Sequence, residues 1–197
     1  MSHTRRKSTI AMMLLLGLSI FGLTPQLALA NATFEAYMYQ EGSDNEGTIR
    51  QEAQDSLAYL VQLGSNNTGY IYQVGESNMS WQLQTGQSNV AQAEIFGNNN
   101  RTTQLQMGDA NDLAIWQSGN NNRLIQNQIG FENQASAWVM GSRNAVLQSQ
   151  IGSGHSSRIN ITGDSNIVSH VQVGFGIQLT VVHFGDDAVI GATHFGL

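Results

Sequence analysis

Glycine recurs every eleven residues through most of this chain. Stepping in elevens from residue 42 to residue 196 gives fifteen positions, of which fourteen are glycine and one is Ala53. Glutamine predominates two places before these positions, and asparagine predominates three places after them. A repeat of fixed length is the signature of architectures in which one structural unit stacks on the next. This repeat therefore constrains the fold more than any local motif does.

The residues between successive glycines alternate between two faces, as in a β-strand. After Asn111, one face carries Leu113 and Ile115, and the other carries Ala114 and Trp116. An eleven-residue period also occurs in right-handed coiled coils, but each glycine would cost ~1 kcal/mol relative to alanine in a helix. Each unit is therefore predicted to be a strand followed by a turn, because glycine tolerates the positive φ of turns. The predicted turn glycines are Gly64, Gly75, Gly86, Gly97, Gly108, Gly119, Gly130, Gly141, Gly152, Gly163 and Gly174.

Alternate units differ in kind, so the true repeat is 22 residues. Glutamine and aliphatic residues alternate at the seventh place after each glycine, as Gln104, Ile115 and Gln126 illustrate. The pattern predicts an all-β fold, a two-sheet β-solenoid of about seven 22-residue coils, with coils stacked at the strand spacing of ~4.8 Å. Asparagine then stacks on asparagine and glutamine on glutamine, and the resulting amide ladders satisfy polar groups that would otherwise be costly to bury. An Asn/Gln-rich disordered tract is the alternative that composition alone would permit.

The first thirty residues have the features of a leader for export. A basic start at Arg5, Arg6 and Lys7 precedes an apolar run, and Ala28-Leu29-Ala30 matches a small-x-small cleavage pattern. Residues 1–30 are therefore predicted to be a secretory signal peptide. The remaining 167 residues carry five arginines, no lysine and fourteen acidic residues, a net charge of 5 − 14 = −9. This charge argues against nucleic-acid binding, and the absence of cysteine excludes disulfide bonds.

The repeat unit resembles that of a known family. Units such as Gln62-x-Gly64-x-x-Asn67-x5-Gln73 resemble the curlin repeat, which is found in subunits of curli, the functional amyloid fibres of bacterial surfaces. The resemblance implies ladder residues at Gln62, Asn67, Gln73, Asn78, Gln84, Asn89, Asn100, Gln106, Asn111, Gln117, Asn122, Gln128, Asn133, Asn144, Gln150, Asn166 and Gln172. It divides the chain into the signal peptide (1–30), a segment with a weak first repeat (31–55), curlin-like repeats forming the solenoid (56–174) and a divergent apolar repeat (175–197).

The resemblance also implies a cellular role. It predicts a structural subunit that crosses the periplasm, leaves through the outer-membrane curli export pore with accessory proteins, and assembles outside the cell by end-to-end stacking of coils into fibres for adhesion and biofilm matrix. The expected partners are other copies of the chain and another curlin subunit. A minor curlin that nucleates fibre growth is the alternative, and the sequence leaves the two open. Physical chemistry points the same way, because a solenoid without capping repeats ends in strand edges that template another chain.

Other candidate features fit structural roles better than chemical ones. His155 occupies an asparagine position, His183 and His194 occupy glutamine positions, and His170 joins the column of Gln148, so substitution within the ladders is favoured over a metal site. Trp116 and Trp138 are spaced to stack on an outer face, either as packing or as an adhesive surface. The turn aspartates are too irregular for the calcium repeat of other β-solenoids. No metal or cofactor is expected.

No catalytic constellation is visible in the sequence. It has no nucleophile elbow, no phosphate-binding loop and no HExxH motif, so the chain is not expected to be an enzyme. Two monomeric alternatives remain. A carbohydrate-binding or carbohydrate-active β-solenoid would need charged residues converging on one face, and an ice-binding solenoid would need flat threonine ladders, whereas these strands carry amides and aliphatic residues.

Overall fold

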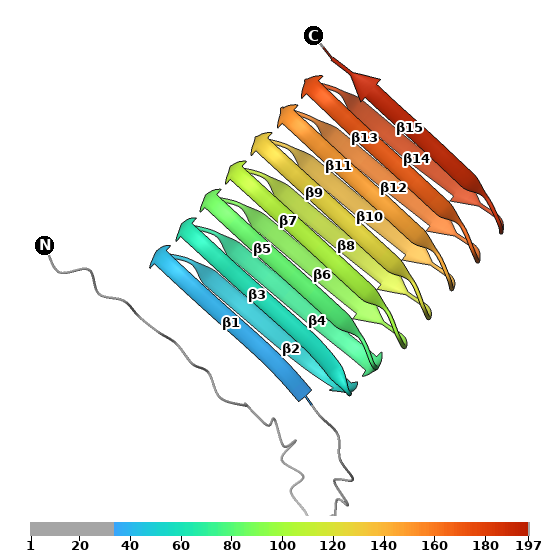
Figure 1. Cartoon of the computed structure of the whole chain (residues 1–197), viewed down its shortest axis with the longest axis horizontal. Helices are drawn as coiled ribbons and strands as arrows, with labels where there is room; N and C mark the ends of the chain where they lie inside the picture. The colour runs from blue at the N-terminus through green and yellow to red at the C-terminus, as the bar shows by residue number, and fades with distance from the viewer. Residues whose placement is uncertain (1–33, 197) are drawn as a thin grey trace, which may run out of the picture.

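The computed structural model describes residues 34–196 and consists of parallel β-strands joined by tight turns (Figure 1). The predicted signal peptide, 1–30, lies outside the described residues. The strands are β1 (Phe34–Ser43), β2 (Glu46–Gln54), β3 (Ser56–Ser65), β4 (Thr68–Glu76), β5 (Met79–Gln87), β6 (Val90–Phe96), β7 (Arg101–Asp109), β8 (Asp112–Ser118), β9 (Arg123–Phe131), β10 (Gln134–Met140), β11 (Ala145–Ser153), β12 (Ser156–Thr162), β13 (Ile167–Phe175), β14 (Gln178–Phe184) and β15 (Val189–Phe195).

Successive strands alternate between two sheets. The eight odd-numbered strands form one sheet in the order β1 to β15, and the seven even-numbered strands form the other in the order β2 to β14. Every strand pairs in parallel with the strand two places on, and Cα partners are 22 residues apart, as in the pair Gln128 and Gln150. The coils lie one above another along a single axis (Figure 1). The predicted two-sheet β-solenoid with a 22-residue coil is confirmed.

The turn glycines are needed for two separate reasons. All eleven predicted ones have φ between 115° and 136°, a region that side chains rarely adopt. Each also lies against the same turn of the next coil, so that an added Cβ on Gly108 would overlap the carbonyl oxygen of Gly130. The position two residues after each glycine also has positive φ, near 55° at Ala110 and Ser88, although it is seldom glycine. Stacking of identical turns therefore imposes a left-handed conformation on ordinary residues.

The interior is divided between the two sheets by residue type. The inward residues of the even-numbered strands are mainly aliphatic, and Ile115, Val139, Ile159 and Ile161 are nearly or fully buried in the largest apolar cluster. The inward residues of the odd-numbered strands are mainly glutamines, and Gln84 and its equivalents are also fully buried. Burying these amides requires hydrogen-bond partners inside the coil.

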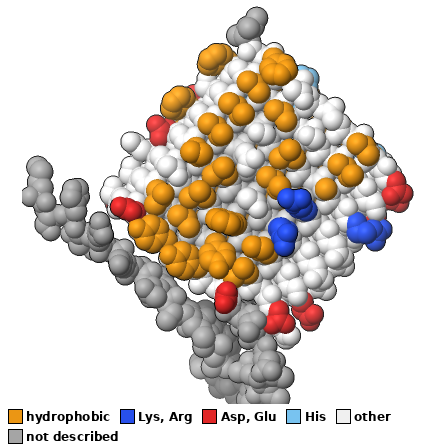
Figure 2. Space-filling model, in the orientation of Figure 1, with side chains coloured by type: hydrophobic (Ala, Val, Ile, Leu, Met, Phe, Trp, Pro, Cys, Tyr) orange, Lys and Arg blue, Asp and Glu red, His pale blue; other side chains and the backbone are white. Residues whose placement is uncertain are grey.

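The outer faces of the two sheets differ in polarity. Figure 2 shows hydrophobic side chains gathered in columns over the odd-numbered strands, the sheet nearer the viewer in Figure 1. Large exposed hydrophobic residues of this sheet include Tyr37, Tyr39, Trp81, Met107, Ile129, Leu147, Ile151, Ile167, Val189 and Phe195. The outer face of the even-numbered strands mixes charged, amide and hydroxyl side chains with its aromatics, as in β12 with Ser156 and Arg158. The solenoid thus has one apolar and one mixed face.

The solenoid extends beyond the segment that the repeat pattern indicated. The same pairing register begins in β1, where Gln40 is the Cα partner of Gln62, and continues to β15, where His194 is the partner of Gln172. Segments 31–55 and 175–197 thus differ from residues 56–174 in sequence, while their described residues share the coil geometry. No helix occurs within residues 34–196, so that range holds no helix able to cross a membrane.

Candidate functional site: amide ladders and open sheet edges

A continuous glutamine ladder runs through the sheet of odd-numbered strands. Gln40 Nε2 donates to Gln62 Oε1 at 2.6 Å, and the same bond recurs in each following coil at 2.8–3.1 Å. Most of these Nε2 groups also donate to a backbone carbonyl of the facing strand, as from Gln106 to Val90 at 2.7 Å. The ladder therefore ties coil to coil and sheet to sheet. Its predicted members are Gln62, Gln84, Gln106, Gln128, Gln150 and Gln172.

The asparagines form two ladders at the turns. In the ladder of Asn67, Asn89, Asn111 and Asn133, each Nδ2 donates to the Oδ1 of the preceding coil at 3.0–3.1 Å. In the ladder of Asn78, Asn100, Asn122, Asn144 and Asn166, the Oδ1 accepts mainly the backbone N–H of the asparagine one coil later, at 2.9–3.1 Å. Every one of these nine side chains also donates to the glycine carbonyl nineteen residues later, as Asn111 does to Gly130 at 2.8 Å. The asparagine and glycine phases are thus coupled by this bond.

The two kinds of ladder point in opposite directions. Glutamine donates to the next coil, from Gln128 to Gln150, whereas asparagine donates to the previous coil, from Asn133 to Asn111. Each interior coil therefore presents a fixed set of donors and acceptors on its two sides. This gives the two ends of the solenoid different hydrogen-bonding character.

The assignment of Gln73 and Gln117 to a continuous ladder was wrong. The Cα partners of Gln117 are Ile95 and Val139, and Ile95 also separates it from Gln73. Gln73 accepts from Gln51 at 2.9 Å and donates to Ser80 Oγ at 2.7 Å. The Nε2 of Gln117 is buried without a partner within the described residues. The reason is that this column of the even sheet changes to aliphatic residues, so the eleven-residue phase is kept while the neighbour one coil away is not an amide.

A second glutamine ladder was missing from the predicted site. Gln82, Gln104, Gln126 and Gln148 are linked by Nε2 to Oε1 bonds of 2.6–3.0 Å. The sequence signal for it is the column of glutamines 22 residues apart, which the ladder residues named from the family's repeat did not include. Gln148 then donates to Ser157 Oγ at 2.6 Å, which in turn contacts His170 Nδ1 at 2.6 Å.

His170 ends this second ladder as a buried, neutral side chain. It is fully buried, and its Nε2 has no partner within residues 34–196. Burial lowers the pKa of His170 to about 4, and the neighbouring His194 lowers it further in the same direction. Within the described residues no cluster of histidine and acidic side chains is placed to hold a metal ion. The histidines therefore occupy ladder positions: His155 takes an asparagine place, and His183 and His194 lie in opposite sheets.

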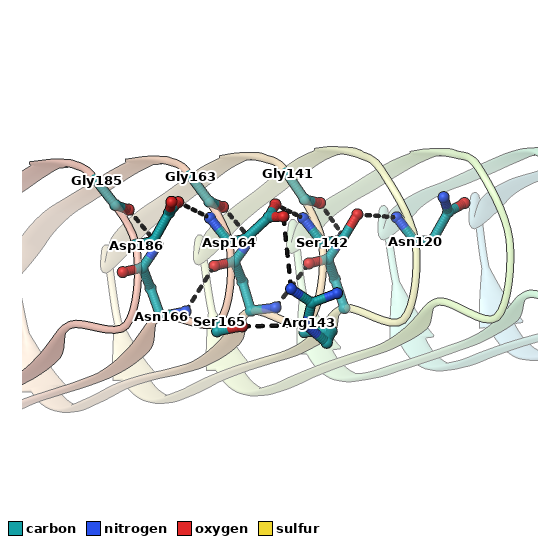
Figure 3. Close-up of polar contacts among 12 residues, drawn as sticks. Asn120, Gly141, Ser142, Arg143, Gly163, Asp164, Ser165, Asn166, Gly185 and Asp186 are labelled. Carbon is teal, nitrogen blue, oxygen red and sulfur yellow. Dashed lines mark hydrogen bonds and ion pairs between the residues drawn. The ribbon is translucent and has the colours of Figure 1, made fainter.

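A further series of hydrogen bonds runs along one row of turns (Figure 3). The backbone N–H of Asn120 donates to Ser142 Oγ at 3.3 Å, that of Ser142 to Asp164 Oδ1 at 2.7 Å, and that of Asp164 to Asp186 Oδ1 at 2.6 Å. Arg143 lies beside Asp164 at 3.6 Å, but both side chains are well exposed, so this ion pair contributes little. The turn aspartates thus act as backbone acceptors.

Both ends of the solenoid are open strand edges. In residues 34–196, β1 and β2 pair on one side only, and so do β14 and β15. The three most exposed large hydrophobic residues are Phe184, Val189 and Phe195, at 75%, 78% and 79% exposure, and all three lie on β14 and β15. Unpaired edges of this kind are templates for another strand.

Aromatic side chains stack along the outer faces. On the even sheet, Trp116 and Trp138 stack with ring centroids 4.1 Å apart and planes 22° apart, and Phe96 continues the row at 6.0 Å from Trp116. On the odd sheet, Tyr59 lies between Tyr37 and Trp81. These rows follow the axis of the solenoid, so stacking adds to the coil-to-coil contacts.

Comparisons with protein-family models, with curated proteins and with solved structures found no match.

Proposed function

We propose that this chain is a structural subunit of an extracellular curli-type fibre, in which copies stack end to end and extend the solenoid. The observation that carries the proposal is the pair of complementary open ends. At one end Gln40 offers the Oε1 that corresponds to the oxygen accepting from the preceding coil in Gln62. At the other end His183 holds a buried Nε2 with no partner within the described residues. A ladder that continued across a junction would join such a donor to such an acceptor.

The resemblance of the repeat to the curlin repeat supplies the rest of the proposal. A subunit of that kind would be exported through the periplasm and a dedicated outer-membrane pore, and its fibres would serve adhesion and the biofilm matrix. The apolar outer face over the odd-numbered strands supports lateral association or adhesion, because exposed apolar patches of this kind mark interaction sites.

Assembly through the ends is tested by a matched pair of lysine substitutions on β15. Ala192 faces the interior at the open edge, whereas the adjacent Thr193 faces solvent. Ala192→Lys would place a charge inside the junction, where desolvating it is costly, so we expect elongation to slow at least tenfold. Thr193→Lys would remain solvated and should elongate as the unchanged protein does. Elongation is measured by thioflavin fluorescence after seeding with preformed fibres, and circular dichroism checks that both variants fold.

Two results would contradict this proposal. One is equal elongation of the two lysine variants, and the other is unchanged protein that stays monomeric after days at high concentration. The same seeding assay separates the two curlin roles. A major subunit should polymerise alone after a lag and make up most of the fibre mass, whereas a nucleator should abolish the lag of a partner subunit at substoichiometric amounts.

A further inference from the structure

Residues 34–196 make an odd number of strands, fifteen, so the two ends of the solenoid are not matched sheet for sheet. The last strand, β15, belongs to the eight-stranded sheet, and the seven-stranded sheet ends one strand earlier at β14. If a second copy stacked in the same orientation, its β1 would pair with β15. The place between β14 and the next β2 would then be empty. This would leave two strand edges unpaired at every junction, each with backbone groups that need partners.

The two half-coils are equivalent in backbone conformation, so a strand of one sheet fits a place in the other. Gly64 in one kind of turn has φ 123° and Gly75 in the other has φ 115°. The position two residues later is also alike, with φ 56° at Asn66 and 55° at Ser77. A rotation of half a turn about the axis, with a rise of one half-coil, therefore superimposes the solenoid on its own pattern.

From this equivalence we propose that successive copies in the fibre are related by a half turn about its axis, so that β1 of the next copy pairs with β14 and β2 of the next copy pairs with β15. This inference rests on the proposed function, because it specifies how the stacked copies are oriented. The junction then contains no empty place, and both sheets continue without interruption.

The side chains at the two ends fit this arrangement. The eleven-residue phase places Gln40 of the next copy directly after His183, so the unpartnered His183 Nε2 meets the Oε1 of Gln40. The donor points toward the next coil, as in every link of the glutamine ladder. In same-orientation stacking, His183 would face the empty place and keep its buried nitrogen unpaired, at a cost of ~1–3 kcal/mol.

The second strand of the junction is complementary in size. Ile49 of the next copy follows Ala192, and Gly47 of the next copy follows Ile190. Each pair joins a large side chain with a small one, which suits interdigitated packing. Within the chain, Ile71 and Ala93 are neighbours of the same kind.

The row of turn hydrogen bonds also continues. Its last member is Asp186, whose side chain accepts from the Asp164 N–H at 2.6 Å. After a half turn, Ser43 of the next copy takes the place that follows Asp186. Ser142 holds the equivalent place in the chain, where its hydroxyl oxygen accepts from Asn120. Ser43 of the next copy would accept from the Asp186 N–H in the same way.

The outer surface of such a fibre would alternate. Each side of the fibre would show the apolar face of one copy and then the mixed face of the next. Apolar patches would therefore recur on each side once every two copies, separated by polar surface, and not as a continuous stripe.

Engineered cysteines distinguish the two orientations, because the chain has no cysteine of its own. Tyr39 on β1 is 37% exposed, and Val182 on β14 is 53% exposed. In the half-turn junction Tyr39 of the next copy lies beside Val182, and in same-orientation stacking it lies beside Thr193. Neighbouring strands are ~4.8 Å apart, within the usual Cα range of a disulfide. The two test proteins are thus Tyr39→Cys with Val182→Cys, and Tyr39→Cys with Thr193→Cys.

Fibres are grown under reducing conditions, oxidised and analysed by non-reducing electrophoresis with mass spectrometry of the linked peptides. Half-turn stacking predicts a ladder of covalent oligomers from the Tyr39→Cys and Val182→Cys protein, and at least tenfold less from the Tyr39→Cys and Thr193→Cys protein. Tyr39→Cys alone is the negative control. Val171→Cys with Thr193→Cys is the positive control, because these residues are Cα partners within one copy.

The outcomes separate this inference from the proposed function. The reverse pattern of cross-links, or fibres in which neither pair cross-links while the positive control does, would overturn the half turn and leave the fibre proposal standing. Failure of every protein to form fibres, including the unchanged chain, would overturn both.

Discussion

The side chain of Gln128 donates a hydrogen bond to the Oε1 of Gln150, one coil further along the chain, at 2.8 Å. Gln128 also accepts from Gln106 at 3.1 Å, so it is paired on both sides. Gln117 is equally buried and lies in the opposite sheet, but its Nε2 has no partner within the described residues. The same residue type at the same burial therefore has opposite expected contributions to stability.

Replacing each of these glutamines with leucine tests the difference. Gln128→Leu leaves Gln150 Oε1 without its ladder donor and Gln106 without its ladder acceptor, so we expect a loss of about 2–4 kcal/mol in the free energy of unfolding. Gln117→Leu removes a buried unpaired amide between Ile95 and Val139, so we expect no loss or a gain of up to ~1 kcal/mol. Urea unfolding of freshly prepared protein measures both. Equal losses for the two variants would show that pairing along the ladder is not what stabilises the interior.

The turn glycines predict a second contrast. Gly108→Ala is expected to lose at least ~3 kcal/mol or to prevent folding, because the added Cβ meets the Gly130 carbonyl oxygen and φ is 121°. Gly154→Asn is the control, because φ there is 65°, near the 56° of Asn66, and a Cβ would meet only atoms 4.0 Å away. That variant should keep its stability to within ~0.5–1 kcal/mol. Thermal unfolding followed by circular dichroism compares them, and a tolerated Gly108→Ala would contradict the close stacking of turns.

The buried histidine at the end of the second glutamine ladder predicts a dependence on acid pH. The pKa of His170 is lowered from 6.5 to about 4 in the folded protein, so the folded state favours the neutral form. Its contribution is fully present above pH ~6.5 and is lost as the pH falls toward about 4, with a total loss of up to ~3 kcal/mol. Unfolding free energies measured across this window should fall, and the slope should be smaller in His170→Gln, which restores the glutamine column of Gln148. An unchanged slope in that variant would assign the pH dependence to other groups.

The stacked indoles on the even sheet predict a measurable coupling. Trp116 and Trp138 are stacked at 4.1 Å, a contact expected to contribute ~0.5–1.5 kcal/mol beyond the area that it buries. A double-mutant cycle with alanine at each position should give a coupling energy of that size. Adhesion to a hydrophobic surface is compared in fibres of the double variant and the unchanged chain. Unchanged adhesion would leave packing as the only role of this pair.

The coil and its register were predictable because they depend on spacing alone. Glycine at a fixed phase, with strands of alternating faces between, determines turns and sheets, and the 22-residue difference between the columns of Ile115 and Gln126 determines which residues stack. The error at Gln73 and Gln117 arose from reading an eleven-residue phase where the partner lies 22 residues away. At that spacing the sequence shows Ile95 and Val139 as the neighbours of Gln117.

Other features depend on three-dimensional detail that spacing does not carry. The opposite directions of the glutamine and asparagine ladders follow from the side-chain rotamers and from the glycine carbonyl that each asparagine reaches, as Asn133 reaches that of Gly152. The left-handed conformation of Glu132 and Arg143 is imposed by the stacked turns, and neither residue type signals it.

The most direct measurement is a helical reconstruction of fibres of residues 31–197 by electron cryomicroscopy. Stacked solenoids with a half turn predict a continuous two-sheet core with a rise of ~36 Å per copy, fifteen half-coils of ~2.4 Å each, and a rotation close to 180°. A fibre core in which residues 22 apart do not stack, or a protein that forms no fibres, would contradict the assembly proposed for this chain.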